Sequence, residues 1–232
     1  MRTKRGFTLI EVATVLAIAV VLATLAYTSL RRSRPRADLL RTAVELRSLV
    51  AGARQQALLS GRSVAVLIFP DHANPEDGKG RVIVVEDPRA QLFLDSAPLN
   101  FGDTYDPATP AAPDGGELFQ TMDLPHGVVV GPVGGLGAAL PAPDASIPDD
   151  TACTFCSTSG DHRGAIVFDG RGRARFYSDN GAALDVAGGT LSVTSTDLAT
   201  IVDEATQAVE AGPATGLVIR AASGSLRTVT RG

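Results

Sequence analysis

An uninterrupted apolar stretch near the N-terminus limits what this chain can fold into more than any other feature. Between Phe7 and Leu30 the only charged residue is Glu11. A helix of about 20 mostly apolar residues crosses the hydrocarbon core of a bilayer, so the stretch predicts a membrane-length helix. Basic residues flank it on both sides: Arg2, Lys4 and Arg5 precede it, and Arg31, Arg32, Arg34 and Arg36 follow it. Charge alone therefore leaves the orientation of the helix open.

Glu11 is the residue in this stretch that needs an explanation. A carboxylate deep in a bilayer costs about 2.5–3.5 kcal/mol on insertion scales, so it needs a partner. Cleavage between Gly6 and Phe7 would supply one, because the new α-amino group of Phe7 would lie about one helical turn from Glu11 in the same or a neighbouring subunit. The alternative is a glutamate near a helix end whose side chain reaches back to the membrane surface.

The residues Gly6-Phe7-Thr8-Leu9-Ile10-Glu11 resemble the prepilin signature of the type IV pilin and type II secretion pseudopilin superfamily. The resemblance implies that a prepilin peptidase removes the leader at 1–6, that Phe7 becomes the N-methylated N-terminus, and that Glu11 guides assembly. Residues 7–30 would then form a transmembrane and filament-core helix. The implied location is the bacterial inner membrane, crossed once, with the head in the periplasm and later at the filament tip.

The residues after the apolar stretch predict that the helix continues. Apolar residues recur at steps of three and four along one face: Leu39, Ala43, Leu46, Val50, Ala53 and Ala57. Gly61 is a plausible C-cap, so residues 31–61 are predicted as an amphipathic continuation that Pro35 breaks or offsets at the join. Relatives often carry a proline earlier in this helix, where this chain has Leu25-Ala26-Tyr27-Thr28, so we expect a straighter first half.

The rest of the chain, residues 62–232, predicts a globular β-rich head. Four segments are expected to form two hairpins, namely 64–69 with 81–86 and 164–168 with 173–177. Residues 191–194 add a further strand, and 216–220 with 226–229 are expected to form a C-terminal hairpin. Residues 87–125 are expected to be mostly loop. The Gly-, Ala- and Pro-rich stretch from Gly131 to Asp150 has little to bury and begins a loop insert at about 131–163. Residues Asp197 to Ala211 are expected to form a short helix.

Composition and charge argue against several classes of function. The formal net charge is −4, and removal of the three basic leader residues would take it to −7, so bulk charge does not attract nucleic acid. Aromatic residues make up 5% of the chain, with no Trp, which disfavours a base-stacking surface. His72, His126 and His162 fall in separate predicted loops, and no Ser or Cys stands in a nucleophile motif. We expect no catalysis, no cofactor and no metal.

Cys153 and Cys156 are the only cysteines in the chain. If the head is exported to an oxidising compartment, a local disulfide between them is the leading interpretation. A thioredoxin-like redox motif would need a strand before and a helix after it, which the sequence does not indicate. A zinc site would need about four ligands, and only His162 lies nearby in the sequence.

Several head segments resemble the GspH/FimT/FimU group of minor pilins and pseudopilins. They are the helix exit Ala53-Arg54-Gln55-Gln56-Ala57, the strand beginning after Leu124-Pro125, and Ile166-Val167-Phe168-Asp169-Gly170. The resemblance implies an α+β fold in which two small antiparallel sheets pack on the long helix. It implies a non-catalytic minor pilin that primes a type IV pilus tip, or alternatively a GspH-like minor pseudopilin of a type II secretion system.

The resemblance also implies partners and one further alternative. Expected partners are other minor pilins or pseudopilins, the major pilin, the prepilin peptidase, the inner-membrane assembly platform and a tip adhesin. Some FimT-like minor pilins bind DNA through a Gly-Arg-x-Arg motif, and this chain has Gly170-Arg171-Gly172-Arg173 followed by Arg175. The motif lies well before the C-terminus, unlike its position in those relatives, so a solvated turn is the competing interpretation.

Overall fold

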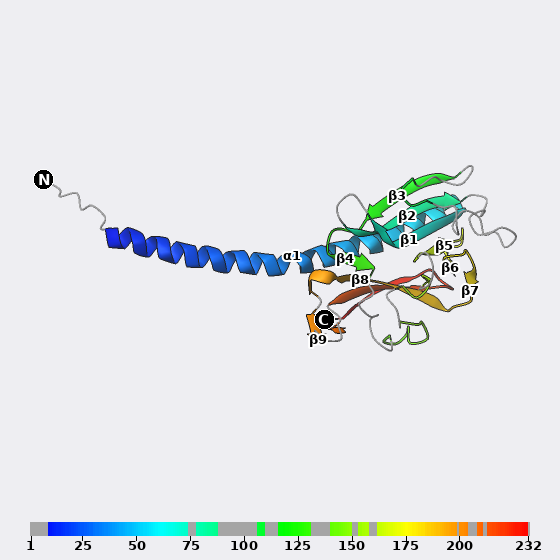
Figure 1. Ribbon diagram of the computed structural model, residues 1–232. Coiled ribbons are helices and arrows are strands. Elements are labelled where there is room, and N and C mark those ends of the chain that lie inside the picture. Colours follow the sequence, from blue (N-terminus) through cyan, green and yellow to red (C-terminus); the bar gives the residue numbers. More distant parts are fainter. Residues whose placement is uncertain are drawn as a thin grey trace.

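The computed structural model describes residues 9–73, 78–87, 106–109, 116–130, 140–149, 153–157, 162–198, 200–203, 208–210 and 213–231. Its longest element is helix α1, Leu9–Ser60, whose first half extends away from a β-rich head (Figure 1). The architecture is α+β, with two main antiparallel sheets packed against the second half of the helix. The predicted fold class is confirmed.

Helix α1 is continuous over 52 residues, including the position of Pro35. Proline removes one helical hydrogen bond, and here this does not end the helix. From Leu39 onward one face is buried in the head, and its buried apolar residues are Leu39, Leu46, Leu49, Val50, Ala53 and Ala57. Gly61 ends the helix with a φ of 68° and donates its N–H to the Ala57 carbonyl at 3.0 Å. A positive φ is the helix-ending conformation that glycine adopts most easily.

The larger sheet has six antiparallel strands. In chain order they are β1 (Ser63–Ala73), β2 (Lys79–Asp87), β3 (Glu117–Asp123), β5 (Gly164–Phe168), β6 (Ala174–Tyr177) and β7 (Ala183–Leu184). Their spatial order is β3-β2-β1-β5-β6-β7. The β1–β2 and β5–β6 pairs are the two hairpins predicted from the sequence. β3 forms one edge of this sheet.

The second sheet has four strands in the order β12-β11-β8-β4. They are β4 (Val128–Val130), β8 (Gly188–Ser195), β11 (Ala214–Arg220) and β12 (Leu226–Arg231). The C-terminal hairpin β11–β12 is present as predicted, and β11 also pairs with β8 over seven residue pairs. A separate pair is formed by β9 (Thr200–Asp203) and β10 (Ala208–Glu210).

The main core lies where the helix meets both sheets. Alternate residues of β1 separate into two buried groups because successive side chains of a strand point to opposite faces. Val64, Val66 and Ile68 join the cluster that includes Leu46 and Val50 of the helix. Ala65, Leu67 and Phe69 belong to a second cluster with residues of β2, β5 and β6. The six-stranded sheet is therefore buried on both faces along β1.

The expected helix at 197–211 is wrong. In the described part of this segment, Thr196–Leu198 forms a single 3-10 turn, and β9 and β10 follow as an antiparallel pair. Thr200, Ile201 and Val202 are β-branched residues in a row, which favours strand over helix. The alanines and the Gly-Pro at its end, from which the helix was inferred, were weaker signals than this run.

Two segments expected to be loops contain more structure than predicted. Within 87–125, strand β3 pairs with β2 through a register shift near Val84. Between 140 and 149, Leu140 and Ile147 are buried against Val218 of β11, so the expectation that this stretch has little to bury is wrong for these residues. Asp144 is also buried there, because arginines from β11 and β12 bind it.

Candidate functional site: the protruding helix and the distal turns

The first half of α1 is the most exposed apolar surface of the molecule. Leu9–Tyr27 has a mean hydropathy of 2.5, and none of it is buried. At 1.5 Å per residue it is about 28 Å long, close to the roughly 30 Å of a bilayer core. Within the described part of the chain, this is the one helix long and apolar enough to cross a membrane. Water would solvate such a surface poorly, so it requires a lipid or protein environment.

Glu11 lies in the first turn of α1, among exposed apolar side chains. The N-terminal end of a helix carries partial positive charge, so a carboxylate is favourable at this position. Close by, the Thr14 hydroxyl donates to the Ile10 carbonyl at 2.7 Å. The hydroxyl hydrogen of this threonine is therefore satisfied within the helix, although the surrounding side chains are apolar. Gly6 and Phe7 lie outside the described residues.

The comparisons with known proteins concern this same end of the chain. Residues 1–27 match a family model described as the prokaryotic N-terminal methylation motif. The N-terminus is type IV pilin-like. No curated protein and no solved structure matches the chain. The pilin-like motif and the exposed apolar helix together fit anchoring in the inner membrane and assembly with pilin or pseudopilin partners.

The pilin-like helix keeps an exposed apolar stripe where its other face packs on the head. Leu40, Val44 and Leu59 are 52%, 69% and 75% exposed, although they lie in the part of α1 that is anchored by buried residues. Side chains three, four or seven positions apart share one helix face, so Leu40 and Val44 are neighbours on the outward side. The outward face of α1 is thus available to another helix.

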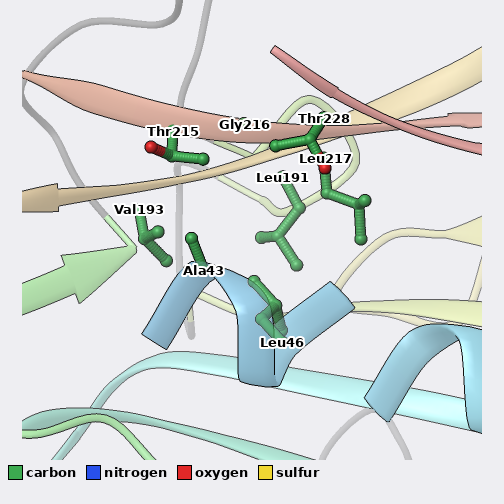
Figure 2. A pocket seen from close by; sticks show the side chains of 8 residues that line it. All are labelled: Ala43, Leu46, Leu191, Val193, Thr215, Gly216, Leu217 and Thr228. Atoms are coloured by element: carbon green, nitrogen blue, oxygen red, sulfur yellow. The ribbon is translucent and has the colours of Figure 1, made fainter. Parts of the chain in front are cut away.

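A narrow gap separates this part of α1 from the four-stranded sheet. Figure 2 shows Ala43 and Leu46 of the helix pointing toward Leu191 and Leu217 of the sheet. The free volume is about 10 Å³, room for about one water molecule. The gap is too small for an organic ligand, and we interpret it as a packing defect between helix and sheet.

The three arginines of the predicted Gly-Arg-x-Arg site lie on and beside the β5–β6 turn. Arg171, Arg173 and Arg175 are all exposed. The guanidinium of Arg173 forms an ion pair with Asp169 at 2.7 Å. Burial acts to raise the pKa of Asp169, but hydrogen bonds from the backbone N–H and side chain of Arg173 outweigh it and lower that pKa. Arg173 is therefore partly neutralised, whereas Arg171 and Arg175 have no side-chain partner among the described residues.

Arg54 connects this turn to the C-terminal hairpin, a role that the sequence did not reveal. From α1, its Nε donates to the Gly172 carbonyl at 3.3 Å and its Nη2 to the Ser223 carbonyl at 3.0 Å. The two turns are so close that a Cβ on Gly224 would lie 2.1 Å from the Gly172 oxygen. The helix end and two β-turns thus form one distal surface of the head.

Cys153 and Cys156 form a disulfide in the structure, with their Cα atoms 5.3 Å apart. Both are buried, and Phe155 between them packs on Phe176 with ring centroids 5.1 Å apart. Thr154 binds Thr190 of β8 twice, through its backbone N–H at 3.1 Å and its hydroxyl at 2.9 Å. The segment is thereby fixed to the head, in surroundings that suit a structural element.

His72 and His162 each lie near charged side chains of the head. His162 contacts Asp71 at 3.2 Å, and burial together with the positive charge of Arg81 lowers the pKa of His72. Arg81 itself is occupied by Asp123, through bonds of 2.6 and 2.9 Å. Among the residues that the structure describes, no three His, Cys, Asp or Glu side chains form a potential metal site.

Proposed function

We propose that this chain is a non-catalytic subunit of a type IV filament, anchored in the inner membrane and assembled through helix α1. The observation that carries the proposal is the match of residues 1–27 to the N-terminal methylation motif on a helix whose apolar half is wholly exposed. The motif family is typically structural. An exposed apolar helix of this length is stable in lipid, and it can exchange its lipid contacts for contacts with neighbouring helices. Filament assembly requires this exchange.

Processing and assembly would act on the same few residues. A prepilin peptidase cuts between Gly6 and Phe7, the Phe7 amine is methylated, and Glu11 pairs with the amine of a neighbouring subunit at the assembly platform. This pairing offsets the cost of holding a carboxylate among apolar side chains, about 2.5–3.5 kcal/mol. The outward stripe with Leu40 and Val44 then continues the helix contact beyond the membrane segment.

Within this class, we propose a minor pilin that primes or caps the filament, with other minor pilins, the major pilin and a tip adhesin as partners. The proposal rests on the resemblance of the head segments to the GspH/FimT/FimU group. The alternative is a minor pseudopilin of a type II secretion system. Capture of native complexes after crosslinking distinguishes the two alternatives. A minor pilin should be captured with pilus subunits, and a minor pseudopilin with other pseudopilins.

The central experiment measures processing and incorporation together. Intact-mass analysis of the protein from its native membrane should give a chain that starts at Phe7 and carries one added methyl group. Glu11→Gln should leave the protein in the membrane but remove it from sheared filaments. Glu45→Gln, which changes an exposed glutamate farther along the same helix, is the matched control. A leader still attached to the native protein, or normal incorporation of the Glu11 variant, would overturn the proposal.

Nucleic-acid binding is a second candidate because Arg171 and Arg175 are exposed on the distal surface. The head is otherwise acidic, since residues 62–232 hold 22 of the 25 acidic residues and 11 of the 21 basic ones. Phosphate contacts weaken steeply with salt. A gel shift with duplex DNA at low salt should therefore be lost in Arg171→Ala/Arg175→Ala and kept in Arg41→Ala/Arg47→Ala. The absence of any shift at low salt would exclude this candidate.

A further inference from the structure

Four arginines lie within six residues of α1, between its apolar half and the head. We refer to Arg31, Arg32, Arg34 and Arg36 as the arginine ring. The helix backbone is continuous through them. With 3.6 residues per turn, successive positions are about 100° apart, so the four positions cover an arc of about 200°, and Arg34 and Arg36 at its ends lie on nearly opposite sides of the helix. A helix that meets one protein surface would be expected to concentrate its cations on one side, which this segment does not.

The ring lies at the depth where a bilayer presents its headgroups. The candidate span Leu9–Tyr27 lies within a stretch that carries no charge after Glu11 and continues to Leu30, and tyrosine, as at Tyr27, is a residue enriched at the membrane interface. Arg31 lies about 6 Å farther along the axis and Arg36 about 14 Å, while the headgroup layer adds about 5–8 Å to each side of the core. Arginine side chains reach several ångströms back toward the interface. Among the described side chains of α1, the first that is buried against the head is Leu39, which comes after the ring.

Among the described side chains, the charges near Arg34 and Arg36 leave these two arginines available to an anion. Arg34 and Arg36 are exposed, and neither forms an ion pair within the described residues. The acidic residues nearest along the helix are Asp38 and Glu45, which are exposed and form no ion pair with a described arginine. The predominantly acidic head would be repelled by an anionic surface. Guanidinium groups bind phosphate oxygens in pairs, which makes arginine the better suited cation for this contact.

We propose that the arginine ring binds the phosphate groups of anionic phospholipids where α1 emerges from the membrane. This inference rests on the proposed membrane-anchored function. Lipid phosphates around the helix can reach Arg34 and Arg36 on its nearly opposite sides, which one flat protein surface cannot do. The bound lipids hold the subunit at a fixed depth, and they must be released or replaced by acidic side chains when α1 enters a filament.

The test measures which lipids the full-length protein retains. The protein is placed in bilayers of phosphatidylcholine and phosphatidylglycerol in equal amounts, extracted with a mild detergent, and its bound lipids are counted by native mass spectrometry. Wild type should be enriched in phosphatidylglycerol. One arginine at an anionic membrane surface corresponds to about a fivefold preference, so Arg34→Gln/Arg36→Gln should reduce the enrichment at least fivefold.

The matched control is Arg41→Gln/Arg47→Gln, which removes the same charge from exposed positions of the same helix beyond headgroup depth. It should retain the wild-type enrichment. An unchanged lipid ratio in the ring variant, an equal loss in the control, or no enrichment of phosphatidylglycerol on the wild type would each overturn the inference. A carbonate wash separates this failure from failure of the membrane anchoring on which the inference rests, because only loss of anchoring removes wild type from the membrane, and the intact-mass and incorporation experiment tests the filament function separately.

Discussion

The Arg220 Nε lies 2.7 Å from one carboxylate oxygen of Asp144, a side chain that is 1% exposed. Arg227 reaches the other oxygen at 2.9 Å and also donates to the Ala142 carbonyl at 3.1 Å. Both arginines come from the C-terminal hairpin, and Asp144 comes from the connection between β4 and β5. One buried carboxylate therefore fastens a loop to strands that lie about 80 residues later in the chain.

Removal of this carboxylate should destabilise the head. Asp144→Ala should lower the free energy of unfolding by about 3 kcal/mol, because it leaves two arginines without their buried partner. Chemical denaturation of the full-length protein in mild detergent measures the change. Asp185→Ala, at an exposed position, should stay within about 0.5 kcal/mol of wild type. Equal effects of the two substitutions would show that the Asp144 contacts contribute little.

The stability of the head should fall in acid through the same group. Burial acts to raise the pKa of Asp144, but the hydrogen bonds and positive charges of Arg220 and Arg227 outweigh it and lower that pKa. A carboxylate with a lowered folded-state pKa contributes its full stability above the unfolded value, about 3.9, and loses it as the pH falls through the folded value. Thermal melts from pH 7 to pH 2.5 should show a smaller acid loss in Asp144→Ala than in wild type. Parallel curves would contradict this assignment.

Two glycines with similar backbone conformations should respond differently to alanine. Gly61 and Gly224 have φ values of 68° and 60°, which cost an alanine about 1–2 kcal/mol. A Cβ on Gly61 meets nothing within 4 Å, whereas one on Gly224 meets the Gly172 oxygen at 2.1 Å. Gly224→Ala should therefore cost at least about 1 kcal/mol more than Gly61→Ala in the same denaturation experiment. A cost no larger than that of Gly61→Ala would mean that the two turns separate easily.

Phe155 should contribute more to stability than the disulfide around it. The disulfide closes a loop with a sequence separation of 3, for which the chain-entropy model gives about 2 kcal/mol. Phe155 is 2% exposed, and removal of a buried phenylalanine side chain costs about 3–5 kcal/mol. We expect Phe155→Ala to lower the unfolding free energy more than Cys153→Ala/Cys156→Ala. The reverse order would indicate that the disulfide holds the segment 153–157 in place.

The predictable parts of the structure were those specified by local chemistry. The run of β-branched residues in Val64–Ile68 and the turn at Asp169-Gly170 identified hairpins, and the spacing of Leu39, Leu46 and Val50 identified the packed face of α1. Strand β3 was missed because Glu117–Thr121 is exposed throughout and shows no alternation. The burial of Asp144 was missed because its partners lie far away in the sequence, where no spacing rule connects them.

The candidate site likewise has features that local sequence predicts and features that it does not. Gly6, Phe7 and Glu11 were recognised from their order alone, and the match over residues 1–27 concerns the same stretch. The arginine turn was found as a motif, but its ion pair with Asp169 and the bridging role of Arg54 depend on how three segments meet in space. Side-chain pairing across such a junction cannot be deduced from residue types.

The continuity of α1 through Pro35 has a mechanical consequence. A helix of 52 residues is about 78 Å long, and it joins a lipid-facing rod to the strands that contact Leu46 and Val50. Because the helical backbone is continuous between them, a twist applied to the rod is passed on to the strands. A protein that binds only the apolar end of α1 and rotates it would therefore also rotate the head about the helix axis.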